Sequence, residues 1–334
     1  MRDLRDFIAR LERAGELVRV GARVDPRLEI TEITDRVTKA GGPALLFTDV
    51  TGSDHPVLIN QFGSERRMNM ALGTESLDAL GARIEGLLDL QPPQGVVAKV
   101  KALGKLRELA SFSPKLVREG PCQEVWLDDP DLERLPVLTC WPGDGGPFIT
   151  LPLVFSRDPR TGGRNCGMYR IQVVDRRTAL MHWQIHKDGA AHLRDSEGRV
   201  PVAVAIGAHP ATTYTATAPL PPGLDEMIFA GFLRGRSVEM VRCRTVDLEV
   251  PAESEIVLEG YVDANDLRPE GPFGDHTGFY TPVDDYPTFH VTGMSMRRDA
   301  VYSTTIVGPP PMEDFYLGKA TERLFLPIIR MTLP

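Results

Sequence analysis

Residues 202–206 read VAVAI and residues 255–261 read EIVLEGY, and these two short apolar runs decide the fold. Two further runs follow the same pattern at 238–241 (VEMV) and 289–294 (FHVTGM). Glycine and proline separate the runs, which is typical of strands joined by turns, and the spacing between them suits a barrel. The sequence after a mixed linker at residues 111–135 therefore predicts a region rich in β-strands.

The first 110 residues have a different pattern, in which helices alternate with short strands. Apolar side chains recur at helical spacing over residues 4–11, and Gly15 is placed to end that helix before the apolar run at 17–20. Residues 30–37 give a second helical period, and a Gly-Gly-Pro break separates it from the strand-like run ALLF at 44–47. This part of the chain is therefore predicted to be α/β.

Length and charge limit the classes of protein to which the chain can belong. Its 334 residues are more than double the roughly 150 of a typical domain, so we expect at least two domains. The formal net charge of −8 disfavours nucleic acid and anionic membranes as partners. The N-terminal residues carry charge throughout, and five prolines interrupt the longest uncharged stretch, at 200–224. We therefore expect a cytoplasmic protein without stable membrane insertion.

Several common site motifs are missing from the sequence. The four cysteines lie at least 18 residues apart, which excludes the close pairs of a zinc knuckle or thioredoxin site and favours reduced thiols. No GxGxxG follows a predicted strand, and neither a P-loop nor a GxSxG elbow is present. Dinucleotide, nucleoside triphosphate and serine hydrolase sites of these kinds are therefore not expected.

Residues 181–186 read MHWQIH, in which apolar and polar side chains alternate as they do along a strand. Such a strand would turn His182 and His186 towards one polar face that could line a cavity. On a helix the same pair could hold zinc, but Trp183 stands where a metalloprotease needs its glutamate. The alternative is a pair of half-exposed polar side chains.

Three further places carry polar residues with more than one interpretation. Glu270 and Asp275 are separated by Gly-Pro-Phe-Gly, a turn that could bring two carboxylates together for acid–base chemistry, or could belong to a solvated acidic loop. Asn165 lies in TGGRNC, where a turn asparagine is the simpler interpretation. Glu226 could be an ordinary first-turn glutamate, favoured there by the helix dipole.

Longer stretches carry a resemblance to a known family. They are LRDFIARLERAGEL, DPRLEITEITDRV, GGPALLF, TCWP, NCGMYR, FAGFLRG, DLEVPAESEIVLEGY and EGPFGDHTGFY. Together they resemble the UbiD-like decarboxylases, which use prenylated FMN, over nearly the whole chain. The sequence is most similar to the 4-hydroxy-3-polyprenylbenzoate decarboxylases of ubiquinone biosynthesis.

The resemblance implies an α+β fold, with an N-terminal α/β domain at residues 1–110. A flavin-reductase-like split β-barrel that binds prenylated FMN is implied for residues 111–315. Residues 316–334 correspond to the start of a helix that links to a further C-terminal domain, so a truncated chain is expected. The apolar tail from residue 324 to 329 is then expected to be disordered or docked on a neighbour.

The resemblance also implies where metal and cofactor bind. Asn165, His186 and Glu226 would hold Mn²⁺ (or Mg²⁺), which bridges to the cofactor phosphate, and this donor set suits Mn²⁺. Potassium would lie nearby, with Glu226 shared and backbone carbonyls around Ala216 and Ala218. The implied cofactor-binding residues are Asn165, Cys166, Met168, Arg170, His186, Ala216, Thr217 and Glu226.

Arg170, Glu270 and Asp275 match the catalytic set of the family. Arg170 would orient the substrate carboxylate or keep Glu270 ionised, and Asp275 would donate a proton to carbon. Asn165 and Arg170 are five residues apart, which in an unbroken strand would turn them to opposite faces. We therefore predict a bulge or turn at Gly167 that lets both face the cofactor.

The implied activity is non-oxidative, reversible decarboxylation of an aromatic or α,β-unsaturated carboxylic acid, such as a 4-hydroxybenzoate-type acid. A flavin prenyltransferase would supply the cofactor, and the full-length form would be a homo-oligomer. One alternative is a catalytically silent flavin- and metal-binding fragment. Another is a flavin reductase on a split barrel, which is less well supported because such enzymes need no Glu-Arg-Asp set.

Overall fold

A computed structural model describes the chain except for residues 89–106, 108, 184–187, 197, 221–223 and 333–334. Its N-terminal part alternates helices and short strands, as predicted. The elements are α1 (Leu4–Arg13), β1 (Leu17–Val20), α2 (Glu29–Lys39), β2 (Ala44–Phe47), β3 (Val57–Ile59), α3 (Glu65–Leu72) and α4 (Leu77–Leu88). None of the helices in the described part of the chain is both long and apolar enough to cross a membrane.

The local sequence explains why α1 forms where it does. The side chain of Asp3 accepts a hydrogen bond from the backbone N–H of Asp6 and so caps the first turn. Arg10 and Arg13 lie in the last turn, where positive charge is favoured by the helix dipole. The buried face consists of the side chains at the predicted spacing, which are Leu4, Phe7, Ile8 and Leu11.

The N-terminal sheet takes one strand from a distant part of the chain. Its order is β1-β2-β3-β18, and β18 (Tyr302–Ser303) runs parallel to β3. The strand pair β1/β2 is also parallel, whereas β2/β3 is antiparallel. The chain therefore returns to its first sheet after it has formed the β-rich part.

The β-rich part contains a large, mostly antiparallel sheet ordered β6-β9-β10-β17-β14-β11-β7-β8, with β5 paired to β17. Its strands are β5 (Val125–Leu127), β6 (Phe148–Ile149), β7 (Leu153–Arg157), β8 (Arg164–Gly167), β9 (Ile171–Val173), β10 (Thr178–Met181), β11 (Arg199–Ile206), β14 (Ile256–Glu270) and β17 (Asp284–Met296). Three of the four predicted runs are confirmed as parts of β11, β14 and β17. Across the described residues the sheet is an open path, and no closed barrel forms.

The fourth predicted run is a strand, but not of this sheet. It forms β12 (Glu239–Arg242), which pairs with β13 (Glu249–Pro251) and β4 (Lys115–Leu116) in a separate three-stranded sheet. A two-stranded ladder, β15 (Phe273–Gly274) and β16 (Tyr280–Thr281), follows β14. Spacing along the chain predicts strands but does not decide which of them pair.

The strand predicted over residues 181–186 is wrong in its extent. β10 ends at Met181, because the chain turns there and the backbone N–H of Trp183 donates a hydrogen bond to the carbonyl of Met181 at 2.7 Å. His182 still donates its backbone N–H to the carbonyl of Arg170 at 3.1 Å. His186 lies outside the described residues.

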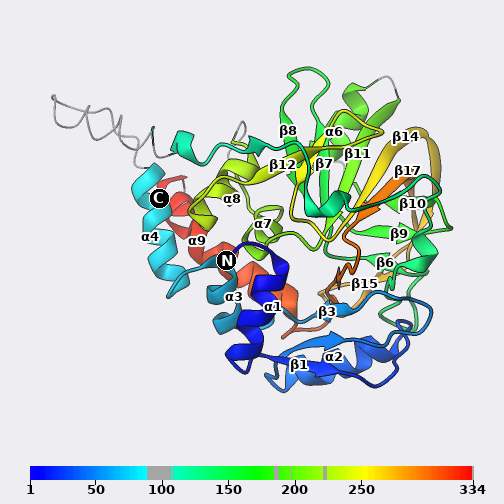
Figure 1. The fold of residues 1–334 in the computed structure, drawn as a ribbon, viewed down its shortest axis with the longest axis horizontal. Coiled ribbons are helices and arrows are strands. Elements are labelled where there is room, and N and C mark those ends of the chain that lie inside the picture. Colours follow the sequence, from blue (N-terminus) through cyan, green and yellow to red (C-terminus); the bar gives the residue numbers. More distant parts are fainter. Residues whose placement is uncertain (89–106, 108, 184–187, 197, 221–223, 333–334) are drawn as a thin grey trace.

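The remaining helices are η1 (Pro121–Gln123), η2 (Leu132–Arg134), α6 (Asp188–Asp195), α7 (Pro210–Thr215), α8 (Glu226–Arg234) and α9 (Glu313–Thr332). Figure 1 shows α4, α8 and α9 side by side on one flank of the molecule, with the large sheet on the other. One apolar core gathers α1, α3, α4, α8 and α9, and a second fills the large sheet.

The expectation for the apolar tail is wrong at Leu324 and Phe325, the first two of its three described positions. Leu324 and Phe325 on α9 are buried in the same core as Leu80 and Ile84 of α4. A Cβ on Gly81 would lie 2.9 Å from the backbone oxygen of Arg323, so glycine permits this close approach. The side chains of residues 327–334 lie outside the described part.

Glu313 joins the start of α9 to the N-terminal sheet. Its carboxylate accepts the backbone N–H groups of Asn60 (3.1 Å) and Phe62 (2.7 Å), just after β3. Burial outweighs these hydrogen bonds and raises the pKa of Glu313 to about 7. The position of α9 therefore depends on a buried carboxyl group that titrates near neutral pH.

Candidate functional site

Arg170 and Glu270 form a buried, bidentate ion pair. Arg170 lies immediately before β9, and Glu270 is the last residue of β14. The guanidinium donates from Nε to Oε1 at 2.8 Å and from Nη2 to Oε2 at 2.9 Å. The Glu270 side chain is 0% exposed and that of Arg170 is 11% exposed. This fork geometry fixes the plane of the guanidinium relative to the sheet.

Two further side chains complete the hydrogen bonding of the pair. Nη2 of Arg170 also donates to Oγ1 of Thr281 at 3.1 Å, and Nδ1 of His182 lies 3.2 Å from Oε2 of Glu270. Burial opposes ionisation of Glu270, but the hydrogen bonds from His182 and Arg170 outweigh it and lower the pKa of this carboxyl. Glu270 is therefore held as a carboxylate at neutral pH.

Aromatic rings support the guanidinium from one side. The Arg170 guanidinium carbon lies 4.4 Å from the ring centroid of Phe273 and 6.0 Å from that of Phe148. The two rings meet edge to face, with centroids 4.8 Å apart. Stacking of this kind stabilises a cation and limits its rotation.

The turn after Glu270 is held by Gln172 of β9 and by Asp144 in the loop before β6. Gln172 accepts the backbone N–H of Gly271 at 2.7 Å and donates from Nε2 to the carbonyl of Gly145 at 3.0 Å. Asp144 accepts the backbone N–H of Gly274 at 2.8 Å. Gly271 has φ +99°, which favours glycine. The position of Glu270 is therefore set by backbone contacts as well as by its ion pair.

Asp275 lies one residue beyond β15, in the loop that leads to β16. Its carboxylate is 2.7 Å from Nδ1 of His276 and makes no hydrogen bond to Arg170 or Glu270. Burial, and to a smaller extent the negative charge of Asp275, raises the pKa of Asp314 at the start of α9. Asp275 is thus near α9, while the other two residues of the predicted catalytic set contact each other.

A cavity of about 630 Å³ lies between the large sheet and α9. This volume is within the range of small-molecule and cofactor sites. It is lined by Thr150, Met168, Thr217, Pro219, Thr305, Val307, Asp314, Leu317, Gly318, Thr321, Glu322 and Phe325. Two predicted cofactor-binding residues, Met168 and Thr217, are therefore in its wall, and Met168 is two residues from Arg170.

Glu226 and Asn165 lie on adjoining elements beside this wall. Glu226 is the first residue of α8, and its Oε2 accepts the backbone N–H of Cys166, the neighbour of Asn165 on β8, at 3.2 Å. Asn165 is 7% exposed, and its Nδ2 is buried without a hydrogen-bond partner among the described residues. Carboxylate and amide oxygens at adjacent positions suit a hard divalent cation.

Other predicted cofactor-binding residues have mainly backbone roles here. Burial raises the pKa of the Cys166 thiol well above its ordinary value, so this thiol is inert. The backbone carbonyl of Ala216, which caps α7, accepts the N–H of Met168 at 3.0 Å. His186, the third predicted metal ligand, is outside the described residues. Within the part of the chain that the structure describes, no three His, Cys, Asp or Glu side chains form a potential metal cluster.

The predicted break at Gly167 is confirmed. β8 ends at Gly167 and β9 begins at Ile171, so Asn165 and Arg170 do not share a continuous strand. A Cβ on Gly167 would lie 2.5 Å from the ring of Tyr169, which leaves room only for glycine.

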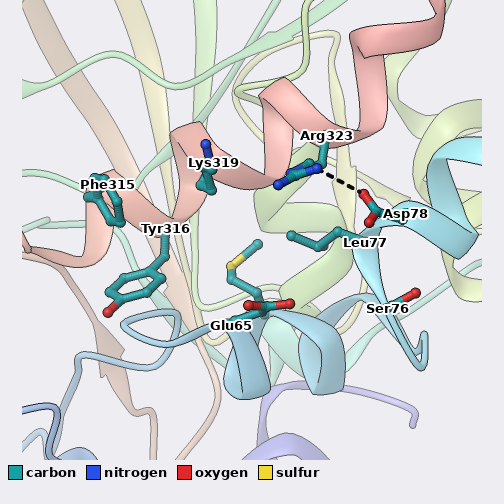
Figure 2. Close-up of a pocket in the computed structure, with 9 residues that line it drawn as sticks. Glu65, Ser76, Leu77, Asp78, Phe315, Tyr316, Lys319 and Arg323 are labelled. Carbon is teal, nitrogen blue, oxygen red and sulfur yellow. Dashed lines mark ion pairs between the residues drawn. The ribbon is translucent and has the colours of Figure 1, made fainter.

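A second cavity, of about 280 Å³, lies against the other face of α9. Figure 2 shows Glu65, Ser76, Leu77 and Asp78 across from Phe315, Tyr316, Lys319 and Arg323. Arg323 is paired with Asp78 at 3.5 Å, and Lys319 is paired with Glu322 at 2.7 Å. None of the predicted site residues lines this cavity, so α9 separates it from the candidate site.

Comparison with known proteins agrees with this geometry. Residues 115–310 match the family model of the 3-octaprenyl-4-hydroxybenzoate carboxy-lyase Rift-related domain, and residues 8–84 match the N-terminal domain of the same family. This chain belongs to the UbiD family. Its N-terminal and β-rich parts correspond to these two domains of UbiD proteins.

UbiD relatives extend beyond the matched region. A protein of Archaeoglobus fulgidus is 53% identical over 336 residues, which cover 99% of this chain and 69% of the relative. A protein of Aquifex aeolicus is 52% identical, with coverage of 100% and 70%.

Solved UbiD-class structures share the fold. An evolved dimeric form of HmfF from Pelotomaculum thermopropionicum, in complex with prFMN, superposes with a TM-score of 0.87 at 30% identity, covering 100% of this chain and 74% of HmfF. The closed form of vanillic acid decarboxylase from Sedimentibacter hydroxybenzoicus gives 0.86 at 28% identity, covering 100% and 70%. The matched family model is that of a carboxy-lyase, and HmfF has been solved in complex with prFMN and with FMN.

Sequence reasoning did not identify all residues of the site. Thr281, Gln172 and Asp144 were not expected near Glu270, and His182 was considered only as a partner of His186. The side chains that meet at Glu270 come from strands that are distant in the sequence, and no local motif joins them. The pairing of β10 and β14 with β17 brings them together.

Proposed function

We propose that this chain is a prenylated-FMN-dependent carboxy-lyase that releases CO₂ from a small aromatic or α,β-unsaturated acid, such as a 4-hydroxybenzoate-type acid. The observation that carries the proposal is the Arg170–Glu270 ion pair. Arg170 is two positions along the sequence from Met168, which lies in the wall of the 630 Å³ cavity. HmfF, which is similar in fold, is in complex with prFMN, and a second similar structure is a vanillic acid decarboxylase.

The residues around the cavity fit such a cofactor. Met168 and Thr217 would contact the flavin, with Cys166 and Ala216 supporting them through their backbones. Asn165 and Glu226, with His186 as the third ligand, would hold Mn²⁺ or Mg²⁺ at the phosphate. A potassium ion would use Glu226 and the carbonyls near Ala216 and Ala218. When bound, prenylated FMN supplies the electron sink that decarboxylation at an sp² carbon needs.

Arg170 would bind and orient the substrate carboxylate. Its Nε and Nη2 are engaged by Glu270 and Thr281, whereas its Nη1 has no hydrogen-bond partner among the described residues. A guanidinium has five N–H donors, so Nη1 can donate to a carboxylate without breaking the ion pair. The ionised Glu270 keeps the fork in place.

Asp275 would provide the proton for the carbon that loses CO₂. It lies in the loop beside α9, near Asp314 in the cavity wall, and a general acid must reach the reacting atom within hydrogen-bond distance. Because Asp275 contacts His276 rather than Glu270, it can change its protonation without disturbing the ion pair.

The proposal is tested with the 334-residue chain coexpressed with a flavin prenyltransferase. We expect a retained modified-flavin absorption spectrum and release of labelled CO₂ from a panel of carboxyl-¹³C aromatic and α,β-unsaturated acids. Protein expressed without the prenyltransferase is the control and should release none. Flavin retention without CO₂ release from any acid of the panel would favour the silent flavin-binding alternative.

A further inference from the structure

His182 contacts both members of the ion pair, although it was not part of the predicted catalytic set. Its backbone N–H donates to the carbonyl of Arg170 at 3.1 Å, and its Nδ1 lies 3.2 Å from Oε2 of Glu270. Its ring packs on that of Tyr286, with centroids 4.3 Å apart and planes inclined by 30°. The imidazole is therefore held by two contacts, and the backbone that carries it is held by a third.

The chemistry of the contact decides which ring nitrogen carries the proton. Glu270 is held ionised, so its oxygens only accept hydrogen bonds. Nδ1 of His182 must then be the donor, which leaves Nε2 of the neutral ring as an acceptor. The His182 side chain is 14% exposed, whereas that of Glu270 is fully buried.

The contact also determines how firmly Glu270 is oriented. Among the described residues, Oε1 accepts only from Nε of Arg170, and Oε2 accepts from both Nη2 of Arg170 and Nδ1 of His182. Without His182 the carboxylate keeps the two arginine hydrogen bonds, but no other side chain among the described residues donates to it. Arg170 would still be held by Thr281 and Phe273, but its partner carboxylate would be less firmly oriented, so the direction of Nη1 would be less well defined.

We infer that His182 is a positioning residue of the proposed decarboxylation: its Nδ1–H anchors Glu270 and thereby aims Nη1 of Arg170 at the substrate carboxylate. The inference rests on the proposed function for its catalytic consequence and on the geometry alone for its hydrogen bond. Charged and titratable groups that face the imidazole are Arg170, Glu270 and Tyr286.

A matched control exists in the same sheet. Nε2 of His290 pairs with Oδ2 of Asp266 at 3.0 Å, and its ring stacks on Tyr261 with centroids 5.0 Å apart. Each histidine thus has its own carboxylate partner and its own tyrosine neighbour, but His182 uses Nδ1 and His290 uses Nε2. In the described part of the chain, His290 makes no hydrogen bond or ion pair with Arg170 or Glu270.

The hydrogen bond is tested on cofactor-free protein by ¹⁵N NMR of labelled histidine at a pH where the imidazoles are neutral. We expect the Nδ1–H tautomer at His182 and the Nε2–H tautomer at His290, each assigned by loss of its signal in a substitution. An Nε2–H tautomer at His182 would overturn the inference whether or not the protein is an enzyme.

The positioning role is tested by three variants at matched cofactor loading. His182→Phe keeps a ring against Tyr286 but removes the donor, and we expect kcat/KM to fall roughly tenfold to a hundredfold, the range of one charge-assisted hydrogen bond. His182→Asn places an N–H near the position of Nδ1 and should restore most of this loss. His290→Phe should leave kcat/KM unchanged.

Two results separate the inference from the proposed function. A wild-type chain that releases no CO₂ refutes the proposed function, while the tautomer measurement still decides the hydrogen bond. A wild-type chain that turns over while His182→Phe has equal kcat/KM refutes the inference alone. Equal impairment of the Phe and Asn variants, with both folded by thermal unfolding, would also overturn it, because the donor would then not be what matters.

Discussion

Replacing Arg170 by methionine removes the cation from a carboxylate that has no access to solvent. In wild type Glu270 accepts two hydrogen bonds from the guanidinium, at 2.8 and 2.9 Å, and one from His182. Breaking a buried pair by removing one partner costs about 3–5 kcal/mol. Because His182 remains, we expect the lower end, about 3 kcal/mol at pH 7, which lowers the thermal midpoint of a 334-residue chain by roughly 4 °C.

The pH dependence of this loss has a definite sign. The pKa of Glu270 is lowered in folded wild type. The ionised carboxylate therefore stabilises the fold at pH values above the pKa of Glu270 in the unfolded chain, and this stabilisation is lost as pH falls through its pKa in the folded protein. In Arg170→Met, burial without the guanidinium should raise this pKa, and the carboxyl will be protonated at low pH. The difference between variant and wild type should therefore be large at pH 7 and shrink near pH 4.

Differential scanning fluorimetry and urea unfolding at pH 4 and pH 7 measure both quantities. Arg199→Met is the control, because Arg199 is 65% exposed and its pair with Asp263 at 2.8 Å lies at the surface. No measurable change is expected for it. If Arg170→Met shifts the midpoint no more than the control, or by the same amount at both pH values, the buried ion pair does not stabilise the fold as argued.

Three other predictions follow from single residues. Wild type should lose up to about 3 kcal/mol of stability between pH 4.5 and 8, because the pKa of Glu313 is raised to about 7 in the folded state and its buried carboxyl ionises over this range. Glu313→Gln lacks this loss, so its stability relative to wild type should rise with pH in urea unfolding. A difference that does not vary with pH would contradict this. Glu226→Ala should lower manganese content and flavin retention together, measured by elemental analysis and absorption, whereas exposed Glu239→Ala should lower neither. Asp275→Asn should keep the flavin spectrum and lose most turnover, since only proton donation is removed, and retention of wild-type turnover would exclude Asp275 as the donor.

Local sequence patterns predict much of the secondary structure of this chain. The helical spacing of apolar residues from Leu4 to Leu11 and the short apolar runs of β11, β14 and β17 depend only on neighbours in the sequence. The break after Gly167 is predictable for the same reason, because the separation of two residues along a strand determines the faces they occupy.

Contacts between distant segments are not predictable in this way. His182 and Glu270 are 88 positions apart and meet because β10 and β14 both pair with β17. The tail that contains Leu324 and Phe325 was expected to be disordered or docked on a neighbour, because the sequence does not show that α4 packs against α9. Within the catalytic set, the sequence spacing of Glu270 and Asp275 does not reveal that only Glu270 contacts Arg170.

The most direct test of the Arg170–Glu270 site is exchange of the ring proton of the decarboxylated product with solvent deuterium. Wild type and Glu270→Gln, which has nearly the same shape without the charge, are compared at equal modified-flavin content by mass spectrometry. We expect flavin-dependent exchange in wild type and a rate at least about a hundredfold lower in Glu270→Gln, because an ionised Glu270 is needed to hold Arg170. Equal exchange rates in the two proteins would contradict this expectation.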